Sequence, residues 1–309
     1  MMKWTMNNRY LNFFLCLMFV SPHLRAQSID PDLIHVIEIE KSIQLQKEKK
    51  PTVSELELGV GYGYGIIPDY PAADEYSRKT VLLPLIIYRG DVIKSDQEEG
   101  TRAELFKSRE LEINLSFGAR FNSDSENNKA RVGMPNLNYI LETGPGLNYK
   151  LWRLPKVASL TLQIPFRFTF ETDFRKTDFV GFVFEPELKF QRINFLVQNL
   201  TASTSVAVEL FSERVANYYY QVENVYVTAG RPAYNAKAGL ASISIGQSFL
   251  YEYNRYNFIF GGSHSYFGKS ENTASPLYKS DTNTSVFVAL AWFFYQKISE
   301  KDIDTSTQR

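Results

Sequence analysis

The feature that most restricts the fold is a stretch of strict two-residue alternation at residues 55–66, Glu-Leu-Glu-Leu-Gly-Val-Gly-Tyr-Gly-Tyr-Gly-Ile. Every even position is apolar or aromatic, and every odd position is Glu or Gly. Side chains of a β-strand point alternately to opposite faces, so the stretch predicts a strand with one apolar and one polar or bare face. It is longer than an average strand of about 5–6 residues and fits a tilted membrane-spanning strand of about 9–11 residues with its ends.

The same alternation recurs along the chain. Clear versions cover residues 111–121, 160–170, 180–190 and 286–294, and weaker versions cover 137–151, 206–211, 218–227, 236–248 and 256–267. The connections are unequal in length, as in outer-membrane barrels. The polar segments 122–129, 270–284 and 91–100 suit long external loops, whereas 152–156 suits a tight periplasmic turn.

Two architectures alternate in this way, a soluble β-sandwich and a membrane β-barrel. The apolar faces here are the larger ones and draw on 23 Phe and 19 Tyr, and aromatic residues such as Tyr62, Trp152 and Tyr295 gather near the ends of the alternating stretches, as in an interfacial girdle. After the N-terminal segment, no apolar run reaches the roughly 18 residues of a spanning helix. Because lipid offers no water to the backbone, only helices and closed barrels span it. We therefore predict an all-β, antiparallel transmembrane β-barrel of about 12 strands, with ten as the second choice.

The N-terminus predicts export. Lys3 and Arg9 precede an apolar run at residues 13–20, and Ala26 supplies a small residue at a cleavage site. This is the pattern of a signal peptide over residues 1–26. Cys16 lies inside it, so the mature chain contains no cysteine and no disulfide stabilises it.

The mature chain divides into three parts by pattern. Residues 27–54 form a charged periplasmic leader, in which Ile34, Ile37 and Ile43 allow either a short amphipathic helix or a solvated segment. Residues 55–295 form the barrel, and residues 296–309 form a polar C-terminal tail.

Two motifs beside the first alternating stretch resemble those of a known family. Pro68, Asp69, Tyr70 and Pro71 precede Tyr76, and a second segment contains Pro84 and ends in Tyr88, Arg89 and Gly90. They are similar to the Pro-Asp-Tyr-Pro-Gly turn and the Leu-Pro-Leu strand ending in Tyr-Arg-Gly of the MltA-interacting protein (MipA/OmpV) family of outer-membrane proteins. Ala72 stands where that family usually has Gly.

Later segments extend the resemblance over residues 55–295. Gly144, Pro145 and Gly146 match a Gly-Pro turn, Tyr234 and Gly239 fall in the counterpart of a Tyr-Arg-Pro strand pair, and Ser275 and Pro276 match a late Ser-Pro element. The resemblance implies an outer-membrane scaffold that links a lytic transglycosylase to a peptidoglycan synthase. Because some relatives are porin-like or adhesive, a channel or an adhesin stays an alternative, and a lipid hydrolase a weaker one.

The charge pattern bears on these alternatives. The 34 basic and 34 acidic residues balance, so the chain lacks the basic excess of a nucleic-acid-binding protein. The polar faces carry both signs, at Glu112, Arg120, Gln163, Arg167, Glu185, Glu187 and Lys189. In a barrel of about 12 strands such side chains can pair across the lumen and close it, because wide aqueous channels appear nearer 16 strands.

Two groups of residues could form a chemical site, but a structural role explains each of them better. Asp69, Asp74 and Glu75 supply oxygen ligands for a cation such as calcium, but they lie in a Pro-rich turn without an acidic-loop consensus. His264 lies one residue from Ser263 and Ser265, so on a strand it faces away from both. We predict no catalytic residue, no cofactor and no metal.

Overall fold

The computed structural model describes residues 53–88, 93–96, 100–108 and 110–299, which fall in one compact unit. Its strands are β1 (Val53–Pro68), β2 (Tyr76–Tyr88), β3 (Ile93–Asp96), β4 (Gly100–Lys107), β5 (Leu111–Arg120), β6 (Tyr139–Leu154), β7 (Ala158–Thr172), β8 (Thr177–Phe184), β9 (Glu187–Arg192), β10 (Leu200–Phe211), β11 (Gly239–Tyr253), β12 (Tyr256–Tyr266) and β13 (Thr282–Ser299). The helices are α3 (Glu213–Tyr220) and the 3-10 turns η1 (Ser125–Asn127) and η2 (Asn224–Tyr226). The predicted signal peptide, residues 27–52 of the leader and residues 300–309 of the tail lie outside the described residues, and the last strand continues past Tyr295 to Ser299.

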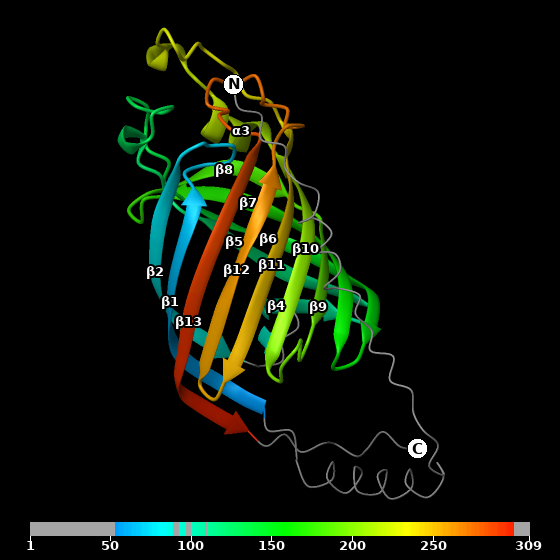
Figure 1. Ribbon diagram of the computed structural model, residues 1–309. Helices are drawn as coiled ribbons and strands as arrows, with labels where there is room; N and C mark the ends of the chain where they lie inside the picture. The colour runs from blue at the N-terminus through cyan, green and yellow to red at the C-terminus, as the bar shows by residue number, and fades with distance from the viewer. Residues whose placement is uncertain (1–52, 89–92, 97–99, 109, 300–309) are drawn as a thin grey trace, which may run out of the picture. The chain divides into compact units, whose positions relative to one another are not determined.

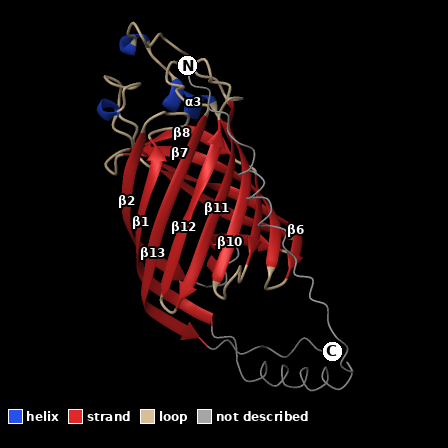
Figure 2. Ribbon diagram, in the orientation of Figure 1, coloured by secondary structure: helices blue, strands red, loops and turns tan. Residues whose placement is uncertain are grey.

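All 13 strands belong to one antiparallel sheet, which confirms the predicted fold class (Figures 1 and 2). The sheet curls into a barrel whose first and last strands, β1 and β13, pair with each other, whereas β2 and β3 end the hydrogen-bonded order. Near the end of β5 the ammonium of Lys79 on β2 donates to the carbonyl of Asn122 at 2.7 Å. This bond links the two sides of the seam directly.

β8 and β9 are two halves of a single strand position. Both pair with β7 and with β10, and the register is unbroken: Phe166 faces Phe184, and three residues along, Gln163 faces Glu187. Only Glu185 and Pro186 separate them, and Pro186 has no N–H to donate to the ladder. Counted once, this pair brings the 13 strands to 12 strand positions, the number that the sequence predicts.

Three sequence predictions need correction. Residues 144–146 lie in the middle of β6 rather than in a turn, and the polar stretch 91–100 contains β3 and the start of β4 rather than one long loop. Residues 218–227, predicted as a strand, contain the end of α3 and all of η2. In α3 the apolar positions recur at helical spacing, and Val215, Ala216, Tyr219 and Tyr220 are buried, so packing of one helical face decides the structure.

The barrel wall has its apolar side chains on the outside and its polar side chains on the inside, the reverse of a water-soluble protein. Outward side chains such as Phe117 and Leu82 are 62% and 69% exposed, whereas the inward Glu112 and Glu142 are 1% and 3% exposed. Alternation thus sends the apolar face to lipid and the polar face to the lumen, as in membrane barrels. None of the described helices is long and apolar enough to cross a membrane.

The apolar core lies at one end of the barrel, among the long connections. The cap consists of residues 69–75, 121–138, 212–238 and 267–281, and its buried cluster includes Tyr70, Met134, Tyr220 and Leu277. We call this the cap end, and the opposite end, where β1 begins and β13 ends, the terminal end (Figure 1). With no disulfide in the predicted mature chain, this cluster holds the connections together by hydrophobic burial.

The inverted faces make a direct prediction on β7, where Leu162 faces outward and Gln163 faces the lumen. Leu162→Arg is expected to cost about 2–4 kcal/mol of folding free energy, because it places a charge in lipid. Gln163→Arg is expected to be tolerated. The folded fraction of each variant is measured by heat-modifiable migration on a detergent gel, and equal losses would mean that the faces are misassigned.

Candidate functional site: a capped chamber in the lumen

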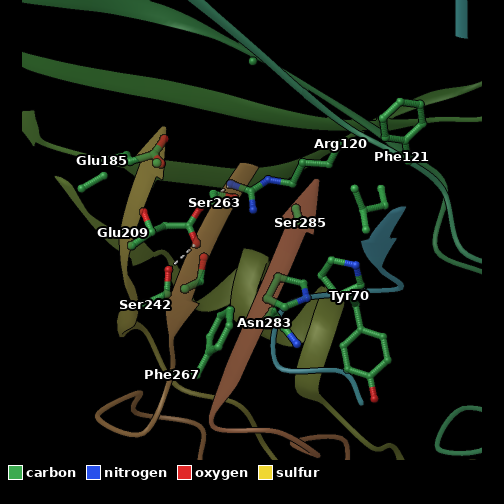
Figure 3. A pocket seen from close by; sticks show the side chains of 18 of the residues that line it. Tyr70, Arg120, Phe121, Glu185, Glu209, Ser242, Ser263, Phe267, Asn283 and Ser285 are labelled. Atoms are coloured by element: carbon green, nitrogen blue, oxygen red, sulfur yellow. Dashed lines mark hydrogen bonds and ion pairs between the residues drawn. The ribbon is translucent and has the colours of Figure 1, made fainter. Parts of the chain in front are cut away.

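A chamber of about 590 Å³ lies in the lumen directly beneath the cap (Figure 3). One wall comes from β10 to β13, where small side chains occupy successive inward positions. The ladders set these residues side by side: Ala207 faces Ser244, Ser244 faces Ser265, and Ser263 faces Ser285. The room in the chamber follows from these small side chains, because larger ones would fill a lumen of this width.

The opposite wall is a network of ion pairs that spans β5 to β10. The Arg120 guanidinium donates from Nε to Glu142 at 2.8 Å and from Nη2 to Glu209. Arg167 pairs with the other oxygen of Glu142 at 2.9 Å and with Glu185. Because β5 and β10 are not neighbours in the sheet, the Arg120–Glu209 pair crosses the lumen.

The network contains two like charges that face each other. The ladder sets Leu210 opposite Phe184 and Ala207 opposite Glu187, so Glu209 lies opposite Glu185. Carboxylates directly opposite each other on neighbouring strands repel. The two guanidiniums offset this repulsion, since Arg120 binds Glu209 and Arg167 binds Glu185.

The predicted lumen residues are brought together only in part. Arg120, Arg167 and Glu185 join the network, and Glu187 lines the chamber without an ion pair among the described residues. Glu112 and Gln163 lie at a different level of the lumen, and Lys189 does not line the chamber. Sequence reasoning missed Glu142 and Glu209, although both alternate with apolar neighbours in stretches that it identified.

The motif turn at residues 69–75 closes the chamber from above. The hydroxyl of Tyr70 donates to the carbonyl of Leu277 at 2.8 Å, and the hydroxyl of Tyr220 on α3 donates to that of Pro71 at 3.1 Å. Asn283 on β13 accepts from the N–H of Ala72 at 2.8 Å and donates to Ala73 at 2.7 Å. The turn is therefore tied to α3, to the last long connection and to the last strand.

The aromatic residue of this turn is a neutral hydrogen-bond donor. Burial raises the pKa of Tyr70 further above its ordinary value of 10.0, so its hydroxyl keeps its proton. The guanidinium of Arg131 lies 5.7 Å from the Tyr70 ring centre, and burial lowers the pKa of Arg131 without neutralising it. The contact has cation–π geometry, which adds attraction between the turn and the connection 121–138.

The remaining motif residues have structural positions. Tyr76 begins β2, and Pro84 lies on the same strand, whose free edge tolerates a residue without an N–H. Tyr88 ends β2, and Arg89 and Gly90 lie outside the described residues. In the cap, the Tyr234 hydroxyl donates to Asn272 at 3.2 Å. The hydroxyl of Ser275, which precedes Pro276, donates to the carbonyl of Tyr220 at 2.7 Å. Gly239 begins β11 and has a φ of 138°.

The two weaker candidate sites are occupied by other contacts. Asp69 accepts from the hydroxyl of Ser77 and from Asn128 at 2.8 Å, and Glu75 pairs with Lys129 at 3.0 Å. Within the described residues no three His, Cys, Asp or Glu side chains are grouped to hold a metal ion. His264 faces outward and bonds Thr284 at 2.8 Å, whereas Ser263 and Ser265 line the chamber.

The sequence profile of the family described as MltA-interacting protein MipA matches residues 60–294. The chain belongs to the MipA family. This confirms the resemblance seen in the motifs and, with the barrel, assigns the protein to the outer membrane. No individually curated protein matches the sequence.

Solved structures align with the chain only at low similarity. The translocator domain of the autotransporter NalP from Neisseria meningitidis aligns at a TM-score of 0.38 and 10% identity, over 86% of this chain and 98% of its own. A bacterial polysaccharide outer membrane secretin aligns at 0.37 and 10% identity, over 79% and 100%. OpdL from Pseudomonas aeruginosa aligns at 0.26 and 11% identity, over 78% and 99%. At such scores the fold assignment rests on the strand ladders of the MipA-family chain itself.

The position of Ala72 explains the glycine that the family prefers there. Ala72 has a φ of 63°, in the left-handed region that favours glycine, and it is fully buried, as is Ala73, which has no positive φ. Ala72→Gly is expected to stabilise the protein by up to about 1 kcal/mol, and Ala73→Gly to destabilise it by about 0.5–1 kcal/mol. Denaturant unfolding in detergent measures both; shifts in the same direction would show that φ is not the cause.

The network predicts unequal effects of removing two lumenal cations. Arg120→Ala leaves Glu142 with one partner and Glu209 without its guanidinium, and is expected to cost about 3–5 kcal/mol of unfolding free energy. Lys189→Ala, which removes an inward cation with no ion pair among the described residues, is expected to change it by less than about 0.5 kcal/mol. Equal costs in the same unfolding assay would argue that the network contributes nothing specific.

The link between Glu75 and Lys129 predicts a local effect of acid. The backbone N–H and ammonium of Lys129 lower the pKa of Glu75 below its ordinary value of 4.5. The folded pKa is the lower one, so the link stabilises the cap above pH 4.5 and is lost as pH falls through the folded pKa. Hydrogen exchange at the Lys129 amide, which donates to Glu75 at 2.7 Å, is expected to accelerate on acidification relative to its intrinsic rate. Glu75→Gln should abolish that dependence.

Proposed function

We propose that this MipA-family protein anchors murein enzymes, a lytic transglycosylase and a peptidoglycan synthase, to the inner side of the outer membrane. In this proposal the cap faces the exterior, the terminal end faces the periplasm, and outer-membrane lipid surrounds the apolar wall. The observation that carries it is the packed core of the cap over the lumen, which favours a scaffold over a conducting pore. The family's description as MltA-interacting supports the class of partner.

The terminal end offers a specific surface for such a partner. Leu196 and Val197, in the connection between β9 and β10, are 77% and 54% exposed. Leu196 also has a φ of 63°, an uncommon conformation for a bulky residue. The neighbouring turn before β7 joins this connection, because the N–H of Ile193 donates to the carbonyl of Val157 at 2.8 Å. Adjacent exposed apolar side chains on a turn of this end suit a protein contact.

The proposal assigns no enzymatic step to the chain. A hydrolase needs a nucleophile within hydrogen-bond reach of its base. The hydroxyls of Ser263 and Ser265 point into the chamber, whereas His264 is on the outward face of β12. The geometry therefore favours binding over turnover.

The test is capture of a lytic transglycosylase by crosslinking and pull-down from envelopes. Leu196→Ser with Val197→Ser is expected to reduce capture, whereas Val225→Ser with Val227→Ser, an equally polar change on exposed cap residues, should leave it unchanged. Deleting residues 32–50 removes Ile34, Ile37 and Ile43 and tests the leader separately, with folding checked by heat-modifiable migration. Undiminished capture by both the turn and the leader variants would refute these docking sites, and no capture by the wild type would favour the adhesin or porin alternative.

A further inference from the structure

The serine wall of the chamber carries unused hydrogen-bonding capacity. Ser205, Ser244, Ser263, Ser265 and Ser285 line it, and their hydroxyls make no side-chain hydrogen bond within the described part of the chain. A hydroxyl is both a donor and an acceptor. Several hydroxyls on one concave wall suit a ligand that is itself rich in hydroxyl groups.

The charged wall indicates the charge of the ligand. Four carboxylates of the barrel wall line the chamber, those of Glu142, Glu185, Glu187 and Glu209, against the two guanidiniums of Arg120 and Arg167. Both guanidiniums already bind carboxylates, and Glu187 has no ion pair among the described residues. The wall therefore has a net negative charge in a confined space, which favours a ligand with a positive group.

The volume of the chamber and the cap above it restrict the size of the ligand. A volume of about 590 Å³ lies in the range of about 300–1,000 Å³ typical of small-molecule sites. Tyr70, Tyr219 and Phe267 border the chamber on its cap side, but they are buried in the core cluster of the cap, so they limit the length of the ligand rather than offer it a free ring face.

We propose that the chamber binds a saccharide with a free amino group, a role separate from enzyme docking at the terminal end. The sugar hydroxyls lie along the serine wall, and the ammonium lies beside Glu185 and Glu187. Arg167, Glu185 and Glu187 also line a second cavity of about 230 Å³, together with Asn114, Asn148 and Gln163. The two cavities therefore adjoin at these three charged side chains.

The test is isothermal titration of the folded full-length protein in detergent with glucosamine, at about pH 6.5, where such an amine is protonated. N-acetylglucosamine, which has the same ring but no positive charge, serves as the ligand control. Glucosamine is expected to bind at least about tenfold more tightly than N-acetylglucosamine, the difference given by one charge-assisted hydrogen bond.

Two variants place the binding in the chamber. Glu187→Gln removes the carboxylate without an ion pair and is expected to weaken glucosamine binding about tenfold, whereas Glu223→Gln, the same change at an exposed cap residue, should not. Ser263→Leu fills the chamber and should abolish binding while heat-modifiable migration persists. Equal affinity for the two sugars, equal affinity of the Glu187 and Glu223 variants, or no measurable binding by the wild type would overturn the proposal.

Discussion

The structure depends on one constraint, that every backbone N–H and C=O within lipid must find a partner inside the protein. β1 meets it by pairing with β2 on one side and with β13 on the other, and most of the wall repeats this arrangement. Two of the prolines in the wall, which have no N–H to donate, lie where the pairing ends or is interrupted. Pro84 lies on β2, whose second edge faces the seam, and Pro186 interrupts a strand whose register continues on both sides.

Satisfying the backbone in this way leaves the side chains to face two solvents. The outward face needs only apolar side chains, whereas the inward face carries buried charges that must be paired with one another. Arg120 and Arg167 do this for Glu142, Glu185 and Glu209 across five strand positions. The hydrophobic core that a soluble protein has at its centre is moved to the cap, where Tyr70 and Tyr220 pack.

Most of the strands and their faces follow from period-two alternation, which is a local property of the sequence, although β2, β3 and β4 lie outside the alternating stretches. The site follows only in part, because its contacts are not local. Arg120 and Glu209 are 89 residues apart in the chain and meet only because the sheet curls. Alternation also gave a wrong prediction at α3, where it indicated a strand. Tyr219 and Tyr220 are buried there because one face of the helix packs into the cap, directly above the chamber. A short amphipathic helix of this kind resembles an irregular strand in sequence.

The inverted barrel is tested most directly by a spin-label accessibility scan of β12. The scan is feasible because the predicted mature chain has no native cysteine that would also take up the label. Labels at Phe258, Phe260 and His264 are expected to be reached by oxygen dissolved in lipid. Labels at Ile259, Ser263 and Ser265, facing the lumen, are expected to be shielded from it and open to a polar relaxation agent. A two-residue period in opposite phase for the two agents is the predicted result, and uniform accessibility along the strand would contradict the inverted barrel.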